Sequence, residues 1–307
     1  EPLPSGRFRV FCGVADMGQG NVATNAQVAG AVLCQPPDAV ELVLPDTAVT
    51  LPSGSSAASR TTYGFASALA GAARTLRDRL LSRAADVLMA PGGEELALVP
   101  GAVRHLPTGR TFPLARLAGL METSERTAVH RFRAPDALDG KGASEGLRLH
   151  GFPHRVFSFG VHLALVEVDE LTGAVEVCRY LAITDCGSLL NPQLAEQQVE
   201  GAVAQGLGLA LSEELLVADG LVGNASLSTY LVPTALDVPP IDTLFVPGHE
   251  ETGPFGMKGV GEIAVNGPIP AVANALADAC GVRLPRAPFT PERVLLALRA
   301  ARKGAPR

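Results

Sequence analysis

The side chains best placed for chemistry in this sequence lie in a glycine-rich stretch, residues 253–262. The stretch contains four glycines and Lys258, ends at Glu262, and leads into the apolar run 263–265. Because glycine has no Cβ, such a backbone can pass close to a bulky ligand. A single carboxylate at the inner edge of the loop is placed like a general base. The alternative is a surface loop in which Lys258 and Glu262 are merely solvated, and the dense glycines and the apolar run disfavour it.

A second candidate site lies on a helix that we expect to begin near residue 191, where proline occupies the first turn. Gln198, Gly201, Gln205 and Gly208 recur at three- and four-residue spacing, which places them on one helix face. Small residues there let a ligand pack closely, and a glutamine amide can donate to and accept from a planar heterocycle. A glycine-tolerant helix in a tight core explains the pattern equally well, so both interpretations stay open.

Two further elements favour phosphate. The turn Gly18-Gln19-Gly20 precedes an expected helix, and such a turn offers backbone N–H groups at the positive end of the helix dipole. The serine- and threonine-rich loop 53–62, with Arg60, can wrap a diphosphate. Alone, the first also fits an ordinary strand-to-helix turn, and the second a solvated loop that caps the next helix. The third glycine of a Rossmann fingerprint is missing, and so is the Gly-Lys-Ser/Thr of a Walker motif, so neither motif is present.

Strands and helices must position these residues. Apolar periodicity predicts strands at residues 8–12, 40–44, 161–169 and 175–184, the last two joined as a hairpin. Helices are predicted at about residues 24–34, 65–87, 191–214, 270–280 and 291–302. The helix 65–87 carries an apolar stripe through Phe65, Leu69, Ala72, Leu76, Leu80 and Ala84. Residues 91–150 show no clear pattern. We expect an α+β fold in two lobes, residues 1–150 and 151–307.

Composition narrows the functional class. The net charge of −6 disfavours a nucleic-acid partner. No apolar run is long enough to span a bilayer and no signal peptide precedes residue 6, so we expect a cytoplasmic location without membrane attachment. The five cysteines are scattered and none forms a C-x-x-C pair, which disfavours a zinc site or iron–sulfur cluster made by this chain alone.

Over nearly its whole length the sequence resembles the C-terminal half of the molybdenum-binding subunit of the xanthine oxidase family of molybdenum hydroxylases. The matching blocks come in the order that the family has: Gly18–Gly20, Asp46-Thr47 with Ser59–Thr61, Val166–Asp169, Asp185–Gly187 with Asn191-Pro192, Gln198–Gly201, Gly256–Glu262, and Pro270-Ala271 with Asn274-Ala275. The resemblance implies the two-lobed molybdopterin-binding fold of that family, here its second half.

The resemblance also implies roles at matching positions. Glu262 would be the base that takes a proton from a metal-bound hydroxyl, and Gln198 would contact the pterin near the metal. The residues expected at the cofactor and its phosphates are Gly18, Gln19, Gly20, Ser55, Ser56, Ser59, Arg60, Thr61, Lys258, Gly259, Val260 and Gly261. No side chain is expected to bind molybdenum directly, since the dithiolene sulfurs of the pterin hold it. The two elements that favour phosphate, the Gly18–Gly20 turn and the 53–62 loop, indicate a dinucleotide cofactor, molybdopterin cytosine dinucleotide.

The implied reaction is hydroxylation of a small N-heterocycle or aldehyde with water. The partners expected are a second molybdenum-subunit half, an iron–sulfur subunit with [2Fe-2S] clusters and an FAD subunit, an arrangement similar to bacterial nicotinate dehydrogenase. The earlier half of the family's subunit is not in this sequence, so we expect either a split subunit or a fragment that is without cofactor when expressed alone. Two alternatives remain: a non-catalytic cofactor-holding subunit, and a phosphate-binding domain unrelated to molybdenum.

Overall fold

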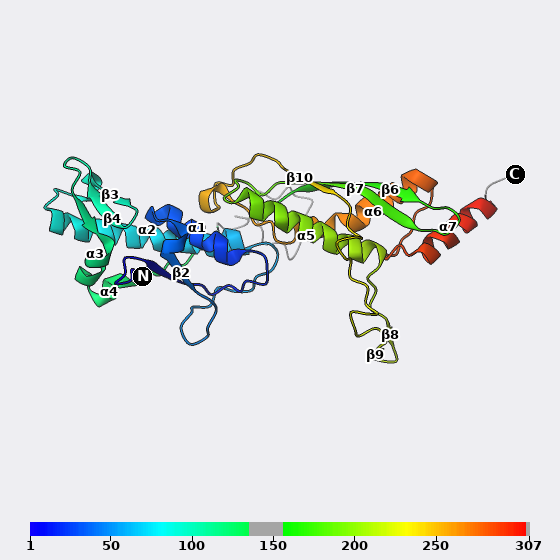
Figure 1. The fold of residues 1–307 in the computed structure, drawn as a ribbon, viewed down its shortest axis with the longest axis horizontal. Coiled ribbons are helices and arrows are strands. Elements are labelled where there is room, and N and C mark those ends of the chain that lie inside the picture. The colour runs from blue at the N-terminus through cyan, green and yellow to red at the C-terminus, as the bar shows by residue number, and fades with distance from the viewer. Residues whose placement is uncertain (135–155, 305–307) are drawn as a thin grey trace, which may run out of the picture. The chain divides into compact units, whose positions relative to one another are not determined.

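The structure of the chain is a computed structural model that describes residues 1–134 and 156–304. The chain forms two compact units (Figure 1). The first contains Glu1–Phe157 and His249–Gly259, and the second contains Ser158–Gly248 and Val260–Arg307. The glycine-rich stretch is thus divided after Gly259. The predicted lobe boundary between residues 150 and 151 lies outside the described residues and stays a prediction.

The first unit is built on a parallel strand pair and two helices that pack together. Strand β1 (Phe8–Phe11) pairs in parallel with β2 (Val40–Val43), and α1 (Asn21–Leu33) connects them. The 28-residue helix α2 (Thr61–Leu88) packs against α1. Both strands and both helices were predicted. Helix α1 begins three residues earlier than expected, because Gly20 takes a left-handed conformation and a carboxylate of the preceding turn binds an N–H in the first turn.

The apolar stripe of α2 faces the core with a small rotation from the predicted one. Leu69, Leu76, Leu80 and Ala84 are buried as predicted. The remaining core positions are Ala66 and Ala73, whereas Phe65 and Ala72 are only partly buried. Sequence periodicity could not distinguish these neighbours, because adjacent alanine and phenylalanine positions satisfy the same apolar pattern.

Residues 96–126, for which no pattern was predicted, form a small subdomain beside α2. Strands β3 (Leu96–Val99), β4 (Ala102–His105) and β5 (Thr111–Pro113) make an antiparallel meander. The short helices α3 (Leu114–Leu120) and α4 (Thr123–Arg126) follow and contact α2. Strands of three or four residues are too short to show a reliable alternation, which is why the sequence did not reveal them.

The second unit is a three-stranded sheet with helices on one face. The sheet order is β10-β7-β6. Strands β6 (Gly160–Val168) and β7 (Val175–Thr184) form the predicted hairpin, and β10 (Ile241–Phe245), which was not predicted, pairs with β7 in parallel. Helices α5 (Pro192–Leu211), α6 (Pro268–Cys280) and α7 (Pro291–Gly304) close the unit. Its core joins Tyr180 and Ala182 of the sheet to Val199, Val203 and Val272 of the helices.

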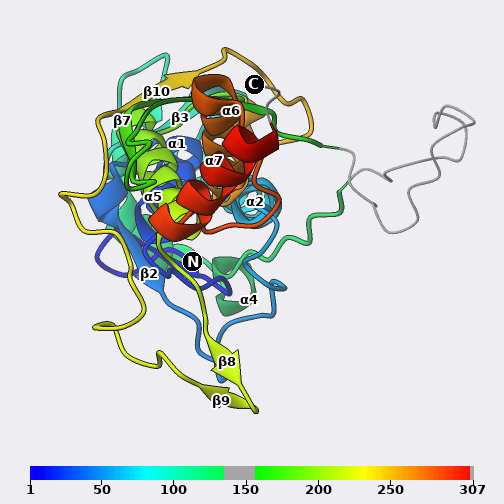
Figure 2. The same cartoon turned by 90° about the vertical axis from the view of Figure 1, so that its right-hand side faces the viewer.

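The segment after α5 leaves the body of the second unit and returns as β10. It carries the small hairpin of β8 (Val217–Ala218) and β9 (Leu221–Val222), which stands off α5 (Figure 2). Helix α5 ends at Leu211, three residues before the predicted end, because the N–H groups of Ser212 and Glu213 both bind the carbonyl of Gly208 and close the helix.

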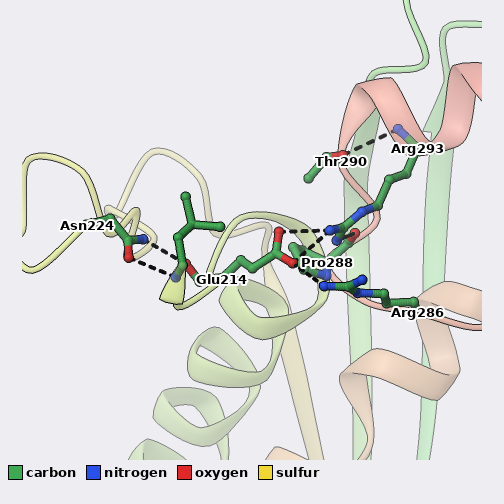
Figure 3. Close-up of polar contacts among 7 residues, drawn as sticks. Glu214, Asn224, Arg286, Pro288, Thr290 and Arg293 are labelled. Atoms are coloured by element: carbon green, nitrogen blue, oxygen red, sulfur yellow. Dashed lines mark hydrogen bonds and ion pairs between the residues drawn. The ribbon is translucent and has the colours of Figure 1, made fainter. Parts of the chain in front are cut away.

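An ion-pair cluster fixes the end of α5 to the start of α7 (Figure 3). Glu214 accepts two hydrogen bonds from Nη2 of Arg293, at 2.7 and 2.9 Å, and one from Nη2 of Arg286 at 3.0 Å. The hydrogen bond from Arg293 is the largest cause that holds the pKa of Glu214 below its ordinary value. The buried Asn224 donates to the carbonyl of Glu214 at 2.7 Å and so closes the base of the β8–β9 segment.

Replacing Glu214 by glutamine should lower the thermal unfolding midpoint near pH 7, because an amide cannot form the charge-assisted bonds to both guanidinium groups. The folded-state pKa of Glu214 is depressed, so its stabilisation is present above the ordinary value of 4.5 and is lost as the pH falls through the folded pKa. The difference in unfolding midpoint between wild type and E214Q, followed by circular dichroism, should therefore shrink as the pH falls through the folded-state pKa.

Asp242→Asn is the matched control for this experiment. It breaks the exposed pair between Arg179 and Asp242 in the same unit, and exposed pairs contribute little to stability. The control should leave the midpoint nearly unchanged. An E214Q protein as stable as wild type near neutrality would show that the cluster does not stabilise the unit.

Candidate functional site

The predicted site residues divide between the two units. The Gly18–Gly20 turn, the 53–62 loop, Lys258 and Gly259 belong to the first unit. Gln198, Val260, Gly261 and Glu262 belong to the second.

A pocket of about 300 Å³ in the second unit brings together residues that the sequence singled out in two separate motifs. It lies where α5 meets the 3-10 turn Ile263–Asn266, which follows the glycine-rich stretch. Its lining consists of Gln198, Gly201, Ala202, Gln205, Gly261, Glu262 and Val265. Ala202 and Val265 were not predicted. Ala202 follows Gln198 by four residues and Val265 follows Glu262 by three, so helical spacing from the two predicted polar residues was the available signal.

A side-chain hydrogen bond joins the two walls of this pocket. Nε2 of Gln198 donates to the carbonyl oxygen of Gly261 at 2.7 Å, across 63 residues of sequence. The start of α5 is itself fixed, because Asn191 caps it by accepting from the N–H of Leu194 at 3.0 Å. The bond therefore holds the residue immediately before Glu262 against a rigid helix. The side chain of Glu262 is exposed at the edge of the pocket.

The glycine positions of α5 differ in what surrounds them. A Cβ at Gly201 would meet nothing within 4 Å, so the helix face is open to the pocket there. A Cβ at Gly206 would lie 2.5 Å from Cγ of Pro268, so this glycine permits the close packing of α5 and α6. A Cβ at Gly208 would lie 2.6 Å from Cδ of Pro233. Gly208, predicted on the same face as Gln198, is thus buried outside the pocket lining.

A histidine–tyrosine pair supports the far side of the turn that follows Glu262. Nδ1 of His162 lies 2.9 Å from the hydroxyl of the fully buried Tyr180. The ring of His162 covers Gly267 so closely that a Cβ there would overlap it. Burial lowers the pKa of His162 and raises that of Tyr180, so both are neutral near pH 7. No sequence pattern indicated this pair, because His162 and Tyr180 are 18 residues apart on two different strands.

In the first unit, the Gly18–Gly20 turn is organised by its own side chains. The carboxylate of Asp16 accepts from the N–H of Gly18 at 3.0 Å and from the N–H of Val22 at 2.8 Å. Gln19 folds back, since its Nε2 donates to the carbonyl of Ala15 at 3.1 Å. Part of the N–H array that was predicted to favour phosphate is therefore bound by a carboxylate in this structure.

The serine-rich loop meets the glycine-rich stretch directly. A Cβ at Gly259 would overlap the carbonyl oxygen of Ser59 and lie 2.6 Å from its carbonyl carbon. Ala58 and Ser59 both take left-handed φ angles, 55° and 53°, which cost non-glycine residues about 1–3 kcal/mol each. The predicted contact partners of a cofactor in these two motifs, Ser59 and Gly259, thus lie side by side.

The other residues of the first unit that were predicted to bind the cofactor differ in their surroundings. Nε of Arg60 donates to the carbonyl of Ser55 at 3.0 Å, so its side chain closes its own loop. Ser55 is exposed and Ser56 half-buried, while Thr61 is the first residue of α2. Nζ of Lys258 donates to the carbonyl of Phe157 at 2.9 Å.

The described residues contain no group of three or more His, Cys, Asp or Glu side chains arranged to hold a metal ion. Among the helices in the same residues, none combines the length and apolar character needed to cross a membrane.

Comparisons with known proteins place the chain in a family. The molybdopterin cofactor-binding domain family matches residues 3–239. The probable hypoxanthine oxidase XdhD of Escherichia coli K12 is 33% identical over 295 residues, which cover 95% of this chain and 29% of that protein. The putative xanthine dehydrogenase molybdenum-binding subunit XdhA of the same organism is 30% identical over 94% of this chain and 37% of its own length.

Solved structures agree with these sequence relatives. Quinoline 2-oxidoreductase from Pseudomonas putida 86 superposes with a TM-score of 0.80 at 29% identity, over 97% of this chain and 37% of that one. The chain therefore belongs to the molybdopterin cofactor-binding domain family, and the predicted resemblance and α+β fold are confirmed. It spans about a third of the length of these relatives. Membership excludes the interpretation as a phosphate-binding domain unrelated to molybdenum.

If the pocket receives the cofactor, Gly201→Leu should keep the fold but lower the molybdenum content of the purified protein complex. The fold should survive because leucine is a good helix former and a Cβ at residue 201 meets open space. Overpacking a ligand contact costs about 1–3 kcal/mol, roughly a 5- to 150-fold loss in affinity for the cofactor. Molybdenum per chain is measured by elemental analysis and stability by thermal unfolding.

Gln197→Leu is the matched control on the same helix. Residue 197 is exposed and lies outside the pocket lining, so leucine there should change neither the molybdenum content nor the unfolding midpoint. Full molybdenum content in G201L would show that the cofactor does not occupy this pocket.

Proposed function

We propose that the chain forms the cofactor-binding part of a molybdenum hydroxylase that oxidises an N-heterocycle or an aldehyde, with Glu262 as the general base. The observation that carries this proposal is the position of Glu262 at the edge of a glycine- and amide-lined pocket, beside the Gln198–Gly261 hydrogen bond. The relatives, named for the oxidation of hypoxanthine, xanthine and quinoline, support the N-heterocycle.

The residues of the pocket fit a pterin. The open face at Gly201 and the small side chain of Ala202 leave room for a planar ring system, and the amides of Gln198 and Gln205 can pair with its polar edge. Val260 and Gly261 would contribute backbone. In the first unit, Gly18, Gln19, Gly20, Ser55, Ser56, Ser59, Arg60, Thr61, Lys258 and Gly259 would hold the rest of the cofactor and its phosphates. When bound, molybdopterin supplies a redox-active molybdenum centre that takes up two electrons.

Glu262 has a defined task in this reaction. Hydroxylation with water replaces a C–H bond by C–OH and releases two electrons and two protons. One Oε atom of Glu262 accepts the proton of the attacking oxygen, which makes that oxygen a better nucleophile. Gln198 positions the base by holding Gly261. The [2Fe-2S] clusters and FAD on partner subunits would take up the two electrons. A second molybdenum-subunit half would be a further partner.

Glu262→Gln should abolish turnover of the complex and leave its molybdenum content unchanged. The carboxamide is nearly isosteric but cannot accept a proton at neutral pH, and losing a general base costs about 100- to 10,000-fold in rate. The rate of single-turnover reduction is compared at equal molybdenum loading, with whichever of hypoxanthine, quinoline or an aldehyde the wild type oxidises.

Glu196→Gln, an exposed position of α5 outside the pocket lining, serves as the control and should react like wild type. Near-normal reduction in E262Q would refute the assignment of the base. It would then favour the alternative proposal, in which this chain is a cofactor-holding subunit without a catalytic residue of its own.

The cofactor should be a dinucleotide, with cytosine as the base. This prediction rests on two separate elements of the first unit that the sequence predicts to bind phosphate, the Gly18–Gly20 turn and the 53–62 loop. A mononucleotide form would need fewer phosphate-binding elements. Acid release from the purified complex, followed by chromatography, should yield CMP in a 1:1 ratio to molybdenum. Recovery of molybdenum without any nucleotide would contradict the dinucleotide form.

A further inference from the structure

The three-stranded sheet of the second unit exposes apolar side chains on its outer face. On β6, the alternate residues Val161, Leu163 and Leu165 are 59%, 58% and 63% exposed. In register with the first two lie Ile183 and Leu181 of β7, and Leu244 of β10 (54% exposed) lies beside Ile183. The face therefore has apolar rows across neighbouring strands.

The opposite face of the sheet is already used. Ala164, Val166 and Val168 of β6 pack against the core, and α5 and α6 contact the sheet on this side (Figure 1). An antiparallel hairpin with one solvated face normally alternates apolar and polar residues, whereas strands covered on both faces are apolar throughout. The outer positions Val161, Leu163 and Leu165 of β6 are all apolar, as expected where a sheet is covered on both faces.

Polar groups mark one end of this outer face. Arg179, in register with Leu165, donates to Asp242 at 2.8 Å across the strands. The apolar rows lie at the other end, toward Val161, Ile183 and Leu244. β6 is moreover an edge strand of nine residues, and long apolar edges left open are prone to aggregation. A face with these properties is typical of a contact surface.

We propose that this outer sheet face docks the remaining polypeptide of the molybdenum-binding protein, the part that the relatives carry outside the homologous segment. The inference rests on the proposed function. XdhD and XdhA align along 95% and 94% of this chain, yet the chain makes up only 29% and 37% of their lengths. In quinoline 2-oxidoreductase the same fold, over 97% of this chain, is 37% of a longer chain. The same strands are thus accompanied by a much larger polypeptide.

Site-specific crosslinking in the complete protein, purified from its native host, tests the contact. A photo-crosslinking amino acid replaces Leu163, and the matched control carries it at Leu171, which is 83% exposed in the β6–β7 turn. The probe at residue 163 should crosslink to the remaining molybdenum-binding polypeptide, on the same chain or on another, and the probe at 171 should not. Crosslinks from 163 to a second copy of residues 160–184, to an iron–sulfur or FAD subunit, or to nothing, would each overturn the proposal.

A charge substitution gives an independent measurement. Leu163→Asp should weaken the contact by at least about tenfold, because burying an unpaired carboxylate is strongly unfavourable. The readout is co-purification of the remaining polypeptide, or its protection from protease if it is on the same chain. Leu171→Asp should not weaken the contact. Because both positions are exposed, neither variant should change the unfolding midpoint of the isolated chain. Normal assembly of L163D would also overturn the proposal.

The metal content of the same preparations separates this proposal from the proposed function. Crosslinks at residue 163 in a protein without molybdenum would refute the function and leave the docking face intact. Molybdenum and turnover without those crosslinks would refute the docking face alone.

Discussion

Backbone contacts that leave no room for a Cβ atom hold each unit of this chain in shape. In the first unit, Gly259 lies against the carbonyl of Ser59. In the second, Gly206 lets α5 pack on Pro268, and Gly267 lies under the ring of His162. Each contact brings together segments far apart in sequence at a distance that any other residue would prevent. The positions of the serine-rich loop, of α6 and of the turn after Glu262 all depend on these contacts.

The candidate pocket follows from a difference along one helix. At Gly206 the space beside α5 is filled by α6, and at Gly201, a turn and a half earlier, it is open. The open part is bounded by the 3-10 turn that Gln198 fixes through Gly261. A glycine is needed at Gly206 for packing, whereas packing within the described chain does not require one at Gly201. The cofactor that we propose for this pocket would occupy the open space beside Gly201.

The second unit also shows how a surface can be stabilised without being covered. The Glu214 cluster fixes the segment that leaves α5, although that segment and the outer sheet face both expose large apolar side chains. The ion pairs and hydrogen bonds of Glu214 hold that segment, and the pairing of β6, β7 and β10 holds the sheet face. An ordered apolar face loses little conformational entropy on association, which favours a stable contact.

The sequence by itself determined the elements with long, regular patterns and the chemistry of their residues. The hairpin of β6 and β7, the buried stripe through Leu69, Leu76 and Leu80, and the motifs of Gln198 and Glu262 could all be predicted, and the family resemblance followed from the order of such motifs. Only the tertiary structure decided that Gln198 holds Gly261, that Asp16 binds the N–H groups of the Gly18–Gly20 turn, and that Gly208 is buried while Gly201 is open. It also decided that the short strands of residues 96–113 form a meander. The physical reason is that periodicity records which side of an element is apolar or small, whereas the group that meets that side is chosen by packing between residues distant in sequence.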